Sequence, residues 1–227
     1  EHGGYLRIAT TTGRVPNPHV HSTMSVLEEV EGRLELTGQV DNIAPTEDIR
    51  SVRFRGDTGY IVTFKKTDPL FVFDLADPYE ISILGELKIP GFSTYMHPMD
   101  RDHLLAIGYE ATEMGSFAYF QGIQLQVFDV SDLEHPALLH KTVIGTRGST
   151  SEATTNHLAF NYYGHRDLLA IPMVICEGGQ RGSYGCDMTF SGLLVYRLTV
   201  DEGFARLGGI PHADPVTGSS YNSVCGN

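Results

Sequence analysis

The stretch Phe71–Phe92, FVFDLADPYEISILGELKIPGF, decides the fold that this sequence predicts. Its pattern is typical of a strand, an Asp-Pro turn, a second strand and a Pro-Gly stop. A similar unit recurs at Val127–Gly145, VFDVSDLEHPALLHKTVIG. Looser versions are VLEEVEGRLELTGQV (26–40) and VYRLTVDEGFARLGGIP (195–211). The chain therefore carries four copies of one two-strand unit.

Two independent alignments of these copies give the same period. The incoming strands align on four bulky side chains: Leu27, Phe73, Phe128 and Tyr196. The outgoing strands align on four further positions: Gly38, Gly85, His140 and Gly208. Successive copies are 46, 55 and 68 residues apart in the first alignment and 47, 55 and 68 in the second. Strand repeats of this length are typical of β-propeller blades, and the growing spacing indicates insertions.

The sequence therefore predicts an all-β protein, a β-propeller of four-stranded antiparallel blades with about three full blades and partial blades at both ends. Blade-like units are expected at residues 5–44, 45–92, 93–147 and 148–205, with the start of a further unit at 206–227. An open propeller leaves sheet edges unpaired. Either the two ends complete one blade of a four-bladed ring, or the chain is part of a longer propeller. The incomplete end units favour the second alternative.

Charge and composition exclude several classes of partner. The formal net charge is −12, from 16 basic and 28 acidic residues, which argues against a nucleic acid or an anionic membrane surface as partner. No apolar run approaches the roughly 18 residues that a membrane span requires. The first residues, Glu1-His2-Gly3-Gly4, lack the basic and apolar parts of a signal peptide, so a leader is expected to lie outside this sequence.

Two of the three cysteines, Cys176 and Cys186, flank the glycine-rich stretch EGGQRGSYG (177–185). We predict a disulfide between them, which would limit the open states of this loop. The alternative is two unpaired thiols. Metal binding is disfavoured, because no Cys-x-x-Cys pattern or histidine ladder accompanies these cysteines. Cys225 has no evident partner in the sequence.

Four histidines are candidate metal ligands, because one pair flanks the expected turn in each of two successive units. His97 and His103 flank residues 99–102, and His157 and His165 flank the equivalent turn. No two of them have tight ligand spacing on one element. Solvated turn histidines are therefore the favoured interpretation, and no metal site or cofactor is assigned.

Recurring carboxylates and a further histidine pair also have structural explanations. Five aspartates lie at or near the repeated turns: Asp68, Asp74, Asp77, Asp129 and Asp132. Calcium binds several carboxylates in one loop, but turn capping explains this recurrence without an ion. His19 and His21 alternate in the loop GRVPNPHVH (13–21), as copper or zinc ligands can. One such pair does not complete a site.

Catalytic and adhesive patterns are weak. Arg55-Gly56-Asp57 spells an integrin-type tripeptide, but it lies within an expected hairpin turn, Gly56-Asp57-Thr58-Gly59. A catalytic set could be drawn from Ser149, Ser151, His157 and Asp167. No Gly-x-Ser-x-Gly elbow exposes either serine, and both lie in an expected connector between blades. No glycine-rich phosphate loop opens a helix, so nucleotide binding has no support.

Segments along nearly the whole chain share a family resemblance. They are YLRIATTTG (5–13), SVRFRGDTGYIVTF (51–64), DPLFVFDLADP (68–78), LGELKIPGFSTYMHP (84–98), QVFDVSD (126–132), GSTSEATTNHLAF (148–160) and LLAIP (168–172). They resemble secreted bacterial and archaeal proteins with a C-terminal β-propeller domain distantly related to WD-40 repeats. The resemblance implies an exported, prokaryotic propeller longer than 227 residues, with its remaining blades as partners. It brings no established catalytic residues.

Three loops depart from this resemblance: residues 13–21, Glu110–Gln121 and Glu177–Gly185. Functions private to this protein are expected there, because loops on a rigid scaffold carry most binding sites. The expected function is a non-catalytic, secreted or cell-surface binding or scaffold module that presents blade loops to a protein or glycan partner. One alternative is a metal-dependent hydrolase or oxidoreductase that uses the propeller channel and the four histidines. Another is a subunit of a larger cell-surface assembly.

Overall fold

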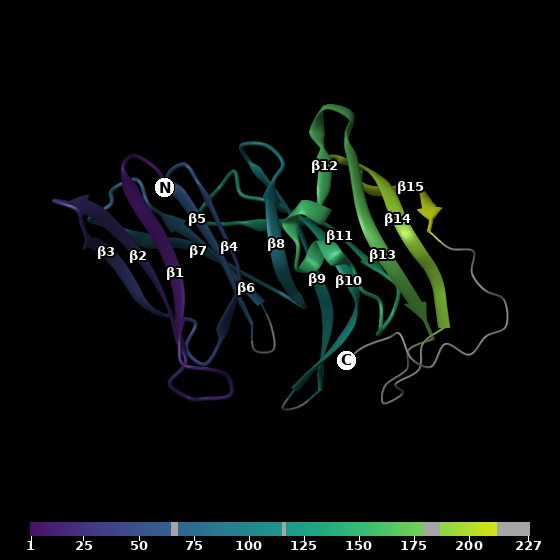
Figure 1. The fold of residues 1–227 in the computed structure, drawn as a ribbon, viewed down its shortest axis with the longest axis horizontal. Coiled ribbons are helices and arrows are strands. Elements are labelled where there is room, and N and C mark those ends of the chain that lie inside the picture. Colours follow the sequence, from purple (N-terminus) through teal and green to yellow (C-terminus); the bar gives the residue numbers. More distant parts are fainter. Residues whose placement is uncertain (65–67, 115–116, 179–186, 213–227) are drawn as a thin grey trace.

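The computed structural model describes residues 1–64, 68–114, 117–178 and 187–212, and it shows an all-β fold. Fifteen strands in these residues form four antiparallel sheets, one for each blade. Figure 1 shows the sheets in a row, with blades 1 and 4 at opposite ends. The described chain therefore does not form the four-bladed ring that was one of the two alternatives.

The blades contain the following strands. Blade 1 consists of β1 (Tyr5–Thr12), β2 (His21–Val30) and β3 (Arg33–Ile43). Blade 2 consists of β4 (Asp48–Arg55), β5 (Thr58–Phe64), β6 (Asp68–Asp74) and β7 (Ser82–Ile89). Blade 3 consists of β8 (Phe92–Pro98), β9 (His103–Met114), β10 (Phe117–Asp129) and β11 (Ala137–Ile144). Blade 4 consists of β12 (Asn161–Tyr163), β13 (Leu168–Glu177), β14 (Asp187–Thr199) and β15 (Gly203–Pro211).

Helical structure is limited to three short 3₁₀ turns in blade 4. They are η1 (Glu152–Thr154), η2 (His157–Ala159) and η3 (Gly164–Arg166). Where the structure describes the chain, it contains no helix long and apolar enough to cross a membrane.

The blade boundaries agree with the repeat except at the C-terminal end. The boundary expected at residue 205 falls within β15, which pairs with β14 as far as Pro211. The start of a further unit at residue 206 is therefore wrong for residues 206–211, because their backbone completes blade 4. Residues 213–227, the rest of that expected unit, lie outside the described residues.

One expected loop is strand, and one strand is short. The described part of the insertion Glu110–Gln121 is strand and not loop, because β9 runs to Met114, β10 begins at Phe117, and Ala111 pairs with Phe120. The first strand of blade 4 is short, because η2 occupies the residues just before it. The Asn156 side chain caps this turn by accepting the Leu158 N–H over 3.1 Å, so strand pairing starts only at Asn161.

A β-bulge at the same place in every blade underlies the sequence repeat. The register shifts directly before each residue of the first alignment: Leu27, Phe73, Phe128 and Tyr196. The residue preceding each bulge pairs across the sheet with a residue of the second alignment: Gly38, Gly85, His140 and Gly208. The two sets of aligned residues thus flank one bulge, which bends the outer strand and increases its twist.

At this bulge the outer strand of one blade contacts the next blade. A Cβ atom on Gly38 would lie 2.5 Å from the carbonyl oxygen of Pro78, and one on Gly85 would lie 2.5 Å from that of Leu133. Blade 3 has His140 at this position, and its Nε2 donates to the carbonyl oxygen of Val200 over 2.6 Å. Glycine in blades 1 and 2 therefore permits a backbone approach that a side chain would obstruct.

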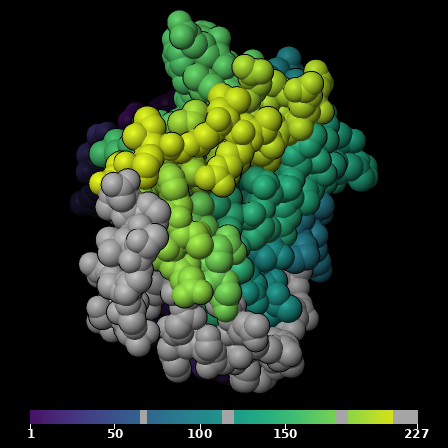
Figure 2. All heavy atoms as spheres, turned by 90° about the vertical axis from the view of Figure 1, so that its right-hand side faces the viewer, coloured from purple at the N-terminus to yellow at the C-terminus, as the bar shows by residue number. Residues whose placement is uncertain are grey.

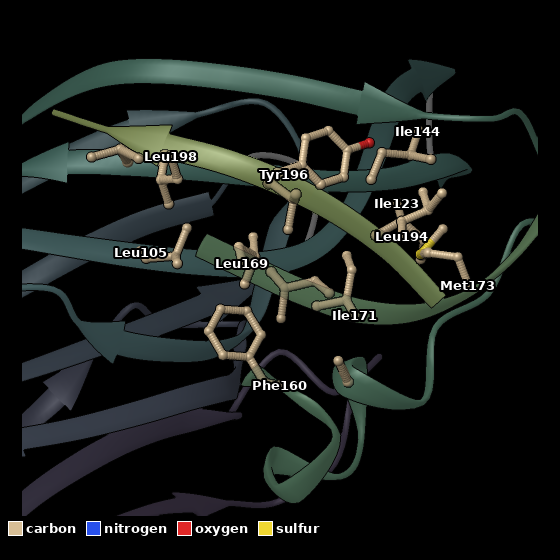
Figure 3. Close-up of a cluster of buried hydrophobic side chains, with 14 of the residues drawn as sticks. Leu105, Ile123, Ile144, Phe160, Leu169, Ile171, Met173, Leu194, Tyr196 and Leu198 are labelled. Atoms are coloured by element: carbon tan, nitrogen blue, oxygen red, sulfur yellow. The ribbon is translucent and has the colours of Figure 1, made fainter. Parts of the chain in front are cut away.

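Apolar side chains fill the interfaces between blades. Figure 3 shows the interface of blades 3 and 4, where alternate residues of each sheet interdigitate. Blade 3 contributes Leu105, Ile107, Ile123 and Leu125, and blade 4 contributes Leu169, Ile171, Leu194 and Leu198, all with no exposed surface. Burying one such side chain stabilises the fold by roughly 1.5–3 kcal/mol. The blades are therefore held together mainly by sheet-to-sheet packing.

The two end blades have faces that no described blade covers. On blade 1, Leu6, Ile8, Leu34 and Leu36 are between 37% and 57% exposed. Leu6 pairs with Leu27, which pairs with Leu36, so a row of leucines crosses this face. Figure 2 views the other end, where β14 and β15 form much of the surface and the β12–β13 turn projects beyond them.

We predict that Gly85→Ala destabilises the protein by about 1–3 kcal/mol, because the new methyl group displaces the β10–β11 turn of the next blade. Urea unfolding followed by circular dichroism measures this difference. Lys88→Ala on the same strand is the control, with an expected change below about 0.5 kcal/mol, since its side chain is largely exposed. Equal stabilities of Gly85→Ala and the wild type would contradict the close contact.

Candidate functional site

The connections between strands lie on two opposite edges of the blades. The edge that we call the turn edge carries the short turns β4–β5, β6–β7, β8–β9, β10–β11, β12–β13 and β14–β15. The edge that we call the loop edge carries the β1–β2 loop, the end of β9 and the start of β10 (Figure 1). The β13–β14 connection also joins strands at the loop edge, but its residues 179–186 lie outside the described residues.

A pocket of about 650 Å³, which we call pocket A, lies on the turn edge between blades 3 and 4. Residues at and beside three turns, β8–β9, β12–β13 and β14–β15, line it. Its polar and aromatic side chains are His97, Asp100, Tyr162, Tyr163, His165, Asp167 and Thr199, and the remaining lining residues are Met99, Gly164, Leu198 and Val200. No lysine or arginine is among the described residues that line it.

Main-chain hydrogen bonds hold the walls of pocket A in place. The β12–β13 turn ends at Asp167 in the left-handed conformation, with φ 53°. The carbonyl oxygen of Asp167 accepts the Leu198 N–H over 2.8 Å. Asp57 and Asp102 accept the N–H groups of Leu75 and Val130 in the same way, also over 2.8 Å. The frame of the pocket is thus a feature of the blade repeat.

Two carboxylates, those of Asp100 and Asp167, stand at the polar side of pocket A. Burial and the negative charges of Asp167 and Asp100 raise the pKa of Tyr162, so this phenol stays protonated and can donate. Burial opposes ionisation of Asp100. Hydrogen bonds from the main chain of Asp102 and from His103 outweigh that effect and lower the pKa of Asp100. At neutral pH the pocket therefore offers carboxylate acceptors beside a phenol donor.

The aromatic side of pocket A is built from rings that pack in tilted and edge-on arrangements. The His97 ring lies 5.8 Å from the Phe160 ring and 5.7 Å from the Tyr162 ring, measured between centroids. Burial and the positive charge of Arg53 lower the pKa of His97, so its imidazole is neutral at pH 7. Tyr163 packs edge-on against His165 and remains 54% exposed. Its ring is therefore accessible to a ligand.

A second pocket, which we call pocket B, occupies the equivalent position between blades 2 and 3 and has a volume of about 300 Å³. The β4–β5, β8–β9 and β10–β11 turns supply its lining. Its charged side chains are Arg55, Arg101 and Asp102. The two pockets thus have the same frame and opposite excess charge.

The four candidate histidines separate into two groups. His97 and His165 line pocket A. His103 instead lies 2.8 Å from Asp100 through its Nδ1, and the His157 ring lies against Tyr95 at 6.4 Å between centroids. Within the described ranges, no three side chains of histidine, cysteine, aspartate or glutamate lie close enough to hold a metal ion. The hypothesis that these histidines bind a metal thus stays a prediction, and no cluster among the described residues supports it.

The repeated aspartates cap turns, as predicted. A carboxylate oxygen accepts the N–H two residues ahead, over 2.8–3.1 Å, in four of them: Asp74, Asp77, Asp129 and Asp132. The side chain of Asp68 lies outside the described residues. His21 turns back onto the main chain of His19, with its Nδ1 2.9 Å from that carbonyl oxygen, and its Nε2 lies 3.6 Å from the Asp41 carboxylate.

The integrin-type tripeptide is engaged in contacts between blades. Arg55 donates to the carbonyl oxygen of Arg101 over 2.6 Å, and the carbonyl oxygen of Gly56 accepts from the guanidinium group of Arg7. The Asp57 carboxylate lies 3.6 Å from the same guanidinium group. These contacts explain the tripeptide as a hairpin turn that joins blades 1, 2 and 3.

The serine-based catalytic set is not assembled. Ser149 is buried and accepts the main-chain N–H of Cys176 over 3.0 Å, and Ser151 donates to the carbonyl oxygen of Pro172 over 2.6 Å. Asp167 precedes the first residue of β13, whereas Cys176 is near its last residue. Strand geometry separates these two positions by about 30 Å. Both serines are therefore structural residues of the connector, as expected.

Cys176 is fully buried at the end of β13. Its expected partner Cys186 and the third cysteine, Cys225, lie outside the described residues. The Cys176–Cys186 disulfide therefore remains a prediction.

Sequence reasoning did not find Asp100, Tyr162 and Tyr163 as site residues. The signal that could have found them is the parallel between LLAI at 104–107 and LLAI at 168–171. These segments begin equivalent second strands, so the turns that precede them occupy the same edge of neighbouring blades.

Comparison with known proteins agrees with this architecture. A family model for the beta propeller domain matches residues 1–226. An uncharacterized protein of Archaeoglobus fulgidus is 37% identical over 182 residues, and an uncharacterized protein of Methanocaldococcus jannaschii is 38% identical over 143 residues. These alignments cover 80% and 62% of this chain but only 26% and 21% of the two relatives. The family match and the four stacked sheets together show that the chain belongs to the beta propeller domain family.

Proposed function

We propose that this propeller segment is a non-catalytic binding module, secreted or on the cell surface, that takes a glycan or protein partner at its turn edge. The observation that carries the proposal is pocket A, whose volume of about 650 Å³ lies within the roughly 300–1,000 Å³ usual for ligand sites. Export is supported by the resemblance to secreted propeller proteins described above.

The side chains of pocket A favour a glycan over a protein. Sugar rings present apolar C–H faces, which pack on exposed aromatic rings such as that of Tyr163. Sugar hydroxyl groups donate to carboxylates and accept from phenols, and Asp100, Asp167 and Tyr162 offer both functions. A few convergent polar groups beside aromatic walls are typical of small-molecule sites.

The blade repeat gives pocket A a rigid frame. Its turns are short, and the Leu198-to-Asp167 hydrogen bond fixes two of them to each other. Because these groups are ordered before a ligand arrives, less conformational entropy is lost on binding. No residue of 13–21, 110–121 or 177–185 is among the described residues that line this pocket, so the proposal places the ligand on the blade turns instead.

Further blades of the same protein are proposed as the partners of the end faces. The chain spans about a quarter of the length of the curated relatives that it matches. The exposed leucines of blade 1 have the alternation of residues that are buried between the other blades. The same face supports the second candidate function, a subunit of a larger cell-surface assembly, in which a neighbouring subunit would cover it. The alternative of a metal-dependent hydrolase or oxidoreductase has no comparable observation in its favour.

We predict that Tyr163→Ala weakens binding of a glycan selected on a glycan array by about 3- to 10-fold, because a stacking surface worth about 0.5–1.5 kcal/mol is lost. Isothermal titration calorimetry with that glycan measures the change. Tyr79→Ala is the matched control, since Tyr79 is similarly exposed and lies on a different turn. Unchanged affinity of Tyr163→Ala would place the ligand outside pocket A.

We also predict that the native protein contains an oxidised Cys176–Cys186 pair, which the export context favours. Peptide mapping by mass spectrometry without reductant is expected to show the two cysteines in one cross-linked peptide. Alkylation of both thiols in the unreduced native protein would contradict this pairing.

A further inference from the structure

Pocket B has the frame of pocket A but mostly hydrogen-bond donors in its lining. Two guanidinium groups, those of Arg55 and Arg101, face one carboxylate, that of Asp102. In a chain of net charge −12, two arginines at one small pocket are a local exception. Because a guanidinium group carries five N–H donors in a planar fork, such a pair suits a carboxylate.

The donors of the two arginines are only partly used. Arg55 donates one Nη1 hydrogen bond to the carbonyl oxygen of Arg101, over 2.6 Å. The side chain of Arg101 is 92% exposed, and its Nε lies 3.8 Å from the Asp102 carboxylate. That distance is too long for a hydrogen bond. Most N–H groups of both arginines are therefore free to bind a ligand.

The Tyr60 hydroxyl is a further hydrogen-bond donor in the lining of pocket B. The residue is only 2% exposed, and its ring packs among apolar residues between blades 2 and 3. It also lines pocket B, and its hydroxyl makes no hydrogen bond to any residue that the structure describes. Burial raises the pKa of Tyr60, so the hydroxyl keeps its proton. A ligand oxygen in the pocket can accept this proton.

We propose that pocket B binds the carboxylate of an acidic sugar residue. The guanidinium groups of Arg55 and Arg101 and the Tyr60 hydroxyl hold the carboxylate. The Thr58 hydroxyl, which also lines the pocket, can donate to and accept from the sugar hydroxyls. The Ser131 hydroxyl lines the pocket too; it donates to the Asp129 carboxylate and can accept from the sugar. An acidic amino-acid side chain has no hydroxyls to use these groups, so the lining favours a sugar. The site shares no lining residue with pocket A and does not depend on a ligand there.

Titration calorimetry with tetragalacturonate tests this inference. Arg101→Gln is expected to weaken binding at least 10-fold, and Tyr60→Phe, which keeps the ring, about 3- to 10-fold. Asp102→Asn is expected to tighten binding about 2- to 5-fold, because it removes the one negative charge in the lining. A purely structural role of Asp102 would not produce a gain in affinity.

Three controls separate local recognition from other effects. Arg33→Gln removes the same charge from an exposed site on blade 1 and is expected to leave the affinity unchanged. The fully methyl-esterified tetramer, which has no charge, is expected to bind at least 10-fold more weakly than tetragalacturonate. Tyr163→Ala in pocket A is expected to have no effect on this ligand, which keeps the test independent of the proposed function.

Several results would overturn the proposal. One is that the wild-type protein does not bind tetragalacturonate. Another is that Arg33→Gln and Arg101→Gln lose the same affinity for it. A third is that the methyl-esterified tetramer binds as tightly as tetragalacturonate. A tetraglutamate peptide that binds more tightly than the sugar, with the same dependence on Arg101, would overturn the assignment to a sugar. Thermal unfolding of Tyr60→Phe shows whether that variant is folded, and the surface variant Arg101→Gln provides the test if it is not.

Discussion

The close approach between the outer strand of one blade and a turn of the next is the contact on which this structure depends. It requires a β-bulge in the outer strand and little or no side chain at Gly38 and Gly85. Where glycine is replaced by His140, the imidazole bonds to the turn of the next blade and so forms the contact with a side chain. The same geometry sets the spacing at which the apolar faces of neighbouring sheets interdigitate (Figure 3). Stacking of the blades and the register within each outer strand are thus linked.

One consequence of this stacking is a repeated frame on the turn edge. In blades 2, 3 and 4 an aspartate carbonyl oxygen accepts an N–H from the end of the third strand, over 2.8 Å each time. The frame leaves a pocket between neighbouring blades, and the side chains at its rim are free to vary. Pocket A thereby acquires two carboxylates and exposed aromatic rings, whereas pocket B acquires two guanidinium groups. Different ligand chemistry on one scaffold is what propellers permit, because rim residues carry little of the packing.

Sequence reasoning and structure differ most where tertiary contacts override a local pattern. Glu110–Gln121 was expected to be a loop that departs from the family resemblance. β9 and β10 nevertheless pair within it, as Ala111 does with Phe120. Part of the reason is that Phe120 packs against Phe64 and Phe92, which come from other strands. For the histidines, the sequence predicted the position along the chain but not the contacts of the side chain. Their positions beside turns were evident, but whether an imidazole enters a pocket or bonds to its own turn depends on the neighbouring blade.

By itself the sequence determined the repeat, the blade architecture and the capping role of Asp74, Asp77, Asp129 and Asp132. These features rest on strand alternation and on hydrogen bonds that span only two residues, so a local pattern records them. The tertiary structure alone decided the open row of blades, the close contacts of Gly38 and Gly85, and both pockets. The reason is distance along the chain. Residues of the β8–β9, β12–β13 and β14–β15 turns form one pocket only after two sheets have packed face to face. The repeat places these turns on one edge of neighbouring blades, but the pocket between them depends on how the two sheets pack.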